Sequence, residues 1–155
     1  MRTEHGVAIH APSCPTAGRL LGSMLQRSYA QLVEADEEHW RAEVLKWEEF
    51  DHEVFQHLDT VGACVFLSWS GEQLVGFAYY DPRQRPDVGI AGHNCVLPEF
   101  RANGFGKQQV HEIIRRFGAS GIRLARVSTL DHRFFIPARR MYIACGFRES
   151  GRHPW

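Results

Sequence analysis

The most informative part of the chain is Val96-Leu97-Pro98-Glu99-Phe100-Arg101-Ala102-Asn103-Gly104-Phe105-Gly106-Lys107. It follows an extended segment and opens a segment of helical periodicity. The first N–H groups of a helix have no intrahelical partners. Two glycines let an anion approach those amides, and the helix dipole with Arg101 and Lys107 favours negative charge there. The stretch therefore predicts a phosphate-binding turn, with a tight turn beside two incidental basic residues as the alternative.

Two other nucleotide-binding motifs do not fit the chain. The sequence contains no Gly-x-x-x-x-Gly-Lys-Ser/Thr, and the motif Gly-x-Gly-x-x-Gly would need a glycine where Gln109 stands. Neither a P-loop nor a dinucleotide-binding turn is therefore expected.

Hydrophobic periodicity on both sides of this stretch predicts alternating helical and extended segments. Helices are expected at 17–33, from Asp36 to about 55, at 104–118 and at 134–145, and strands at 63–69, 73–80, 88–97, 122–130 and 147–150. The first three strands are expected to be antiparallel neighbours, because a short turn joins the first two. The helix at 104–118 connects the third and fourth strands by a crossover, which makes that pair parallel.

A second motif follows the first at a distance. Arg-x-x-Gly-x-Gly comes after Val96-Leu97-Pro98, and Ala138-Arg139-Arg140-Met141-Tyr142-Ile143-Ala144-Cys145-Gly146-Phe147 lies downstream. Together, in this order, they resemble the GNAT superfamily of acetyl-CoA-dependent N-acetyltransferases. The resemblance covers about Val61 to Phe147, and the two N-terminal helices match only in kind.

The resemblance implies an α/β (α+β) fold with a mixed, mostly antiparallel central sheet, a parallel splayed strand pair and helices on both faces. Residues 1–155 would form one domain, with 1–16 as a flexible or first-strand arm. In this superfamily the strand before the phosphate-binding turn is interrupted by a bulge and splays from its neighbour.

The same resemblance implies acetyl-CoA as the acyl donor, with CoA as product. The backbone of Cys95, Val96 and Leu97 would hydrogen-bond the pantetheine arm. The pyrophosphate would be held by the main-chain amides of Ala102, Asn103, Gly104, Phe105, Gly106 and Lys107, with charge from Arg101 and Lys107. Arg139 or Arg140 would reach the 3′-phosphate, with a solvated arginine on the helix surface as the alternative. The superfamily often has asparagine where this chain has Phe135, which removes one polar contact.

By resemblance, Tyr142 would give its proton to the departing thiolate. The alternative is a tyrosine in an apolar helix face, with its hydroxyl satisfied in the core. For the general base, His93 is the first candidate, with Asp87, the pair Asp131 and His132, or a water relay as alternatives. Cys95 has no assigned basic partner, so packing is expected there and direct attack in a ternary complex is favoured over a cysteine nucleophile.

Composition excludes several other classes. The chain of 155 residues is 44% hydrophobic and 23% charged, which is typical of a globular domain. No apolar run approaches the roughly 20 residues that span a bilayer, and residues 1–15 lack a secretory signal, so a cytoplasmic protein without membrane contact is expected. Four scattered cysteines and nine histidines show no metal-ligand spacing, so no metal is expected. Zero net charge, and basic residues that do not interleave with aromatic ones, argue against nucleic acid.

Residues 31–59 are strongly acidic and include Trp40 and Trp47. They predict an acidic, aromatic rim that would attract an amine, although both tryptophans also fit the core of an amphipathic helix. The predicted function is transfer of an acetyl group from acetyl-CoA to a primary amine of a small molecule or peptide. An acyl-CoA-binding sensor without turnover is the alternative. The chain is expected to be a monomer or homodimer.

Overall fold

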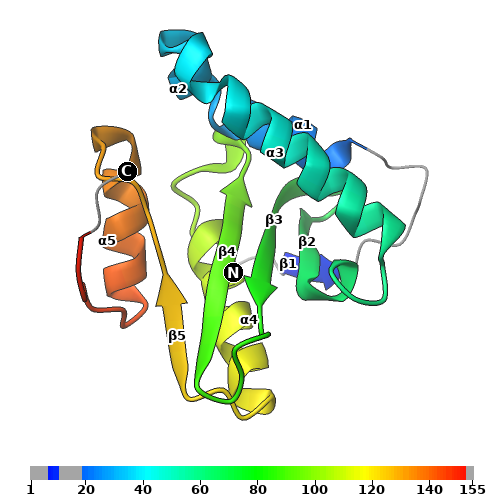
Figure 1. Cartoon of the computed structure of the whole chain (residues 1–155), viewed down its shortest axis with the longest axis vertical. Coiled ribbons are helices and arrows are strands. Elements are labelled where there is room, and N and C mark those ends of the chain that lie inside the picture. The colour runs from blue at the N-terminus through cyan, green and yellow to red at the C-terminus, as the bar shows by residue number, and fades with distance from the viewer. Residues whose placement is uncertain (1–6, 11–18, 153–155) are drawn as a thin grey trace, which may run out of the picture.

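The computed structural model describes residues 7–10 and 19–152 (Figure 1). One five-stranded sheet has the order β1-β2-β3-β4-β5. The strands are β1 (Val7–His10), β2 (Val65–Ser70), β3 (Gln73–Asp81), β4 (Val88–Val96) and β5 (Leu124–Val127). The first three neighbouring pairs are antiparallel and β4 pairs with β5 in parallel. This mixed sheet confirms the predicted fold class.

Helices cover both faces of the sheet. They are α1 (Leu20–Ser28), α2 (Ala30–Ala35), α3 (Glu37–Gln56), α4 (Phe105–Ala119) and α5 (Ile136–Ala144), with 3₁₀ turns at Gly62–Cys64, Pro98–Phe100 and Arg133–Phe135. In Figure 1, α1 and α3 lie together on one face and α4 lies on the other. The hydrophobic core therefore has two layers, one on each face of the sheet. Phe77 belongs to the layer under α1 and α3, and Phe66 to the layer under α4.

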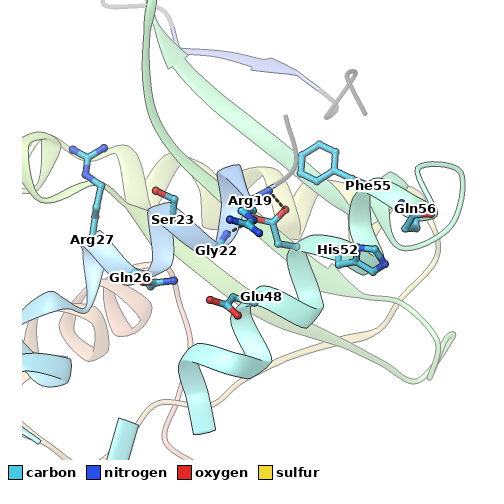
Figure 2. Close-up of a pocket in the computed structure, with 10 residues that line it drawn as sticks. Arg19, Gly22, Ser23, Gln26, Arg27, Glu48, His52, Phe55 and Gln56 are labelled. Carbon is cyan, nitrogen blue, oxygen red and sulfur yellow. Dashed lines mark hydrogen bonds between the residues drawn. The ribbon is translucent and has the colours of Figure 1, made fainter. Parts of the chain in front are cut away.

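A buried carboxylate joins helices α1 and α3. Asp51 of α3 is 1% exposed and accepts hydrogen bonds from the N–H groups of Arg19 at 3.1 Å and Gly22 at 2.6 Å. Those N–H groups belong to the first turn of α1, where helix donors lack partners. Asp51 lines a cavity of about 760 Å³. Figure 2 shows Arg19 and Gly22, which line it from the start of α1, and Glu48 and His52, which line it from α3. The carboxylate therefore fixes where α1 begins.

Local chain signals set most element boundaries. The side chain of Asp36 caps α3 by accepting the His39 N–H at 3.1 Å, which confirms the predicted helix start. Gly146 follows α5 with a φ of 99°, the left-handed conformation that ends many helices. The hairpin of β2 and β3 is also confirmed.

Three predicted elements differ from the structure by more than two residues. The helix expected at 17–33 is broken at Tyr29, whose φ of −106° and ψ of 16° separate α1 from α2, and residues 17–18 lie outside the described residues. The strand expected at 122–130 is shortened to Leu124–Val127. The strand expected at 147–150 does not form, and the Phe147 N–H instead donates to the Tyr142 carbonyl at 3.1 Å, which closes the C-terminal turn of α5.

A bulge interrupts β4 and its neighbour β5 leaves it early. Ala78 opposes Asn94 and Tyr80 opposes Ala91, so two β4 residues, 92–93, face the single residue Tyr79. Glycine is required at 92, because a Cβ there would lie 2.4 Å from the Tyr79 ring. Pairing with β5 ends at Ala91, while β4 continues to Val96. The expected bulge and splay are therefore present.

Candidate active site

Two cavities meet at the place where β4 and β5 separate. The first, of about 740 Å³, is lined by residues from the end of β4, the start of α4 and the segment leading into α5, and we call it the cofactor-side cleft after the role that the resemblance implies. The second, of about 340 Å³, lies beneath α3, and we call it the acceptor-side cavity on the same ground. Tyr29, Asn94, Phe135 and Ala138 line both. The sheet is thus open at this point to ligands from two directions.

The turn before α4 presents a row of unpaired amides to the cofactor-side cleft. Gln108 makes the first intrahelical bond, to the Gly104 carbonyl at 3.1 Å. Within residues 7–10 and 19–152, the N–H groups of residues 102–107 donate to no protein acceptor. Ala102 and Gly104 take left-handed φ values of 63° and 83°, which fold the turn. Successive free amides at a helix N-terminus are an anion-binding site.

Gly106 keeps open the space between these amides and β4. A Cβ at this position would lie 3.6 Å from Asn94 Nδ2, 3.6 Å from Val96 Cγ2 and 3.9 Å from Met141 Cε. These are ordinary contact distances, so a methyl group would fit sterically but would occupy the cleft.

Basic side chains surround the cleft, as the sequence predicted. Arg101 and Lys107 both line it. The Arg101 guanidinium donates to the Ser28 carbonyl and to Ser28 Oγ at 3.1 Å, and it lies 5.6 Å from the Phe134 ring centroid. Arg101 therefore also ties the end of α1 to the turn. Arg133, which sequence reasoning did not single out, lines the same cleft.

The backbone groups of Cys95, Val96 and Leu97, the three residues expected to contact the pantetheine arm, point to different edges of the chain segment. Val96 lines the cofactor-side cleft, and its carbonyl accepts a bond from Ser28 Oγ at 3.3 Å. The Leu97 N–H instead donates to the Val75 carbonyl at 2.9 Å. Successive residues of a strand direct their backbone groups to opposite edges, so residues two apart share an edge. The backbone of Cys95, two residues before Leu97, therefore faces β3 as that of Leu97 does. Burial raises the pKa of the Cys95 thiol to about 12, which fits packing rather than nucleophilic attack.

A pair of hydrogen-bonded amides, one of them fully buried and both missed by sequence reasoning, supports the junction of the two cavities. Gln109 is 1% exposed, and its Nε2 lies 2.7 Å from Asn94 Oδ1, 3.2 Å from the Cys95 carbonyl and 3.3 Å from the Phe77 carbonyl. Three surrounding oxygens fix the orientation of the Gln109 amide. Asn94 Nδ2 is thereby turned toward the cleft, where it bonds the Gly106 carbonyl at 3.2 Å. The one available signal was a glutamine on the apolar face of a predicted helix.

Tyr142 lies at the acceptor-side cavity beside this pair. Its side chain is buried, and its ring packs edge-to-face on Phe147 at 5.7 Å. Burial raises the pKa of Tyr142 to about 12, while the neighbouring Asn94 amide opposes that increase. The phenol therefore keeps its proton throughout the physiological range, as a proton donor must.

His93 occupies the bulge and lines the acceptor-side cavity. Its ring packs on Phe50 at 4.9 Å and Phe77 at 6.3 Å. Burial lowers the pKa of His93 to about 4, against the opposing effect of Glu43. The imidazole is therefore neutral at pH 7.

The other base candidates lie elsewhere. Asp87 lines neither cavity. Asp131 pairs with Arg139 at 2.8 Å, and His132 Nδ1 accepts the Phe134 N–H at 3.0 Å. Arg139 itself lines a third cavity of about 190 Å³, apart from the cofactor-side cleft.

The described residues contain neither a cluster of metal ligands nor a helix that could span a membrane. Within residues 7–10 and 19–152, no three His, Cys, Asp or Glu side chains gather as metal ligands would. No helix in those two ranges has the length and apolarity to cross a membrane.

Comparison with known proteins gives a family match and several structural likenesses. The sequence model of the acetyltransferase (GNAT) family matches residues 29–147. No curated protein matches the chain. Among solved structures, the PaiA N-acetyltransferase of Thermoplasma acidophilum, in complex with coenzyme A, has a TM-score of 0.77 and 15% identity over 96% of this chain and 93% of its own.

Two further structures show the same fold at low identity. A GNAT-family protein of Desulfovibrio desulfuricans has a TM-score of 0.73 and 21% identity over 94% of this chain and 87% of its own. AAC(6′)-Iy, in complex with a bisubstrate analogue of CoA and acetylneamine, has a TM-score of 0.64 and 20% identity over 97% of this chain and 96% of its own.

Proposed function

The chain belongs to the GNAT acetyltransferase family, and from this premise we propose that it transfers an acetyl group from acetyl-CoA to a primary amine. The proposed reaction is direct attack in a ternary complex. The observation that carries the proposal is the meeting of two cavities at the splay of β4 and β5, one of them edged by free amides. One cavity supplies an anion site for the donor, and the other gives the amine a separate approach.

The donor would bind along the cofactor-side cleft. The free amides of residues 102–107, with Arg101 and Lys107, would hold the pyrophosphate. The backbone of Val96 and Asn94 faces the opening and would pair with the pantetheine arm. Acetyl-CoA supplies the activated acyl group as a thioester.

In the transfer step a C–N bond forms as the C–S bond breaks. His93, neutral in the folded protein, accepts the proton of the attacking amine and passes it to water, since a pKa of about 4 makes it a weak base. A backbone amide near Val96 stabilises the developing oxyanion. Tyr142 donates its proton to the departing sulfur and regains a proton from solvent, which returns the phenol to its starting state.

Two measurements test the proposal together. Calorimetry with acetyl-CoA should give saturable binding that ATP does not reproduce, and a thiol-trapping assay should detect CoA release in the presence of an amine. Binding without release across a broad panel of amines would instead identify an acyl-CoA sensor. Absence of binding would reject the acetyl donor itself.

A further inference from the structure

The acceptor-side cavity carries very little charge. Among the described residues that line it, Glu43 is the one side chain with a formal charge at pH 7, since burial keeps His93 neutral. No lysine or arginine lines the cavity within residues 7–10 and 19–152. Glu43 is only about one-third exposed and pairs with the outward Lys46 at 3.0 Å. Its field reaches the cavity, because Glu43 acts on the pKa of His93.

Aromatic rings form a large part of the remaining wall. Tyr29 stacks on Trp47 with centroids 5.3 Å apart and on Trp40 at 6.5 Å. Phe135 closes the same side, 6.0 Å from Tyr29. Trp47 is 4% exposed and is part of the core, whereas Trp40 is only partly buried and forms the rim. Faces of tryptophan and tyrosine attract an ammonium group and bury an apolar body.

From this charge count we infer the class of acceptor, an inference that rests on the proposed acetyl transfer. The acceptor is a compact primary amine with one ammonium group, an aromatic or apolar body, and no carboxylate. A volume of about 340 Å³ accommodates roughly ten non-hydrogen atoms, at about 30 Å³ for each water-sized unit.

The wall disfavours the other amine classes. An amino acid would bring a carboxylate into a cavity with no cation to pair it, and an unpaired buried charge is costly. A polyamine or an aminoglycoside carries several ammonium groups, whereas Glu43 offers one carboxylate. Glu43 attracts the single ammonium, the aromatic wall holds the body, and the deprotonated amine then reaches the splay.

Matched acceptors test the inference by CoA release. Phenethylamine should have a kcat/KM at least about tenfold above those of phenylalanine, spermidine and kanamycin, because each of the latter leaves a buried charge unpaired. Glu43→Gln should raise the KM for phenethylamine about tenfold, as expected for loss of a charged partner, without changing the Kd of acetyl-CoA. Glu48→Gln, on the same helix but at the cavity of Figure 2, is the control.

Amine binding supplies a readout that does not require turnover. Phenethylamine should quench tryptophan fluorescence at lower concentration than phenylalanine or spermidine, and Trp40→Phe should weaken the quench. Equal or tighter binding of phenylalanine or spermidine would overturn the inference. If acetyl-CoA binds but no amine releases CoA, the proposed transfer fails, and the fluorescence ranking still supports or overturns the inferred ligand class.

Discussion

Tyr142 joins a buried ring to a hydroxyl that stays protonated, with its pKa raised to about 12. Tyr142→Phe removes only the oxygen, so the packing against Phe147 should remain. We expect kcat to fall by about 10²-fold, the lower range for loss of a general acid, with an unchanged Kd for acetyl-CoA. Tyr80→Phe is the control, because that hydroxyl bonds the Ala63 carbonyl away from both cavities. An unchanged kcat would remove Tyr142 from the mechanism.

His93 should make stability depend on pH. The ordinary pKa of histidine is 6.5 and the folded protein lowers it to about 4, so between these values the unfolded chain binds the proton and the folded protein does not. The contribution of His93 to the free energy of unfolding is therefore fully present above pH 6.5. It is lost as the pH falls toward 4, by up to about 3 kcal/mol at 1.36 kcal/mol per pKa unit.

Urea unfolding at about pH 7.5 and about pH 5 measures this change. His93→Gln should flatten the difference between the two pH values, whereas His111→Gln, an exposed position on α4, should keep it. A pH dependence that survives in His93→Gln would assign it to other groups.

Gln109 positions Asn94 and has one buried oxygen, Oε1, without a partner among the described residues. Gln109→Leu removes that unpaired oxygen together with the Nε2 donor that contacts three oxygens, so the free energy of unfolding should fall by about 1–3 kcal/mol. It also releases the Asn94 amide, and we expect kcat to fall about tenfold, the factor that corresponds to one hydrogen bond. Gln108→Leu, its exposed neighbour, should leave kcat unchanged. An unchanged kcat in Gln109→Leu would show that Gln109 does not position Asn94 for the reaction.

The two glycines at the start of α4 have separable effects. Gly104 has a φ of 83° and no atom within 4 Å of its would-be Cβ, so Gly104→Ala strains the backbone and should cost about 1 kcal/mol of stability. Gly106 lies inside the helix, where Gly106→Ala should gain up to about 1 kcal/mol.

Acetyl-CoA affinity should respond in the opposite order. Gly106→Ala places a methyl group beside Asn94 Nδ2 and should weaken binding more than Gly104→Ala does. Chemical denaturation and calorimetry on both variants test the pair. An unchanged affinity of Gly106→Ala for acetyl-CoA would show that the donor does not bind in this cleft.

Elements that depend on local signals could be predicted from the sequence, and those that depend on distant partners could not. The Asp36 cap and the β2–β3 hairpin are determined by residues that are close in the sequence. The break at Tyr29 instead accompanies packing of its ring against Trp47. The amides of Asn94 and Gln109 meet only after β4 and α4 pack together, so no local pattern revealed this part of the site.

At the scale of the whole molecule, bound donor should stabilise the fold. A ligand present at about a hundred times its Kd adds about 2.7 kcal/mol if it binds only the folded state. For a chain of this size, each kcal/mol raises Tm by about 2–4 °C, so acetyl-CoA should raise Tm by roughly 5–10 °C. Thermal unfolding with and without acetyl-CoA measures the shift. An equal shift with ATP would indicate nonspecific binding of anions, and no shift would contradict the proposed donor site.

Tyr29 and Asn94 form a common wall of the two cavities. Any displacement of that wall by one substrate alters the space offered to the other, which makes the two affinities thermodynamically linked. Linkage is reciprocal, so the factor by which acetyl-CoA changes the affinity for the amine must equal the factor by which the amine changes the affinity for acetyl-CoA.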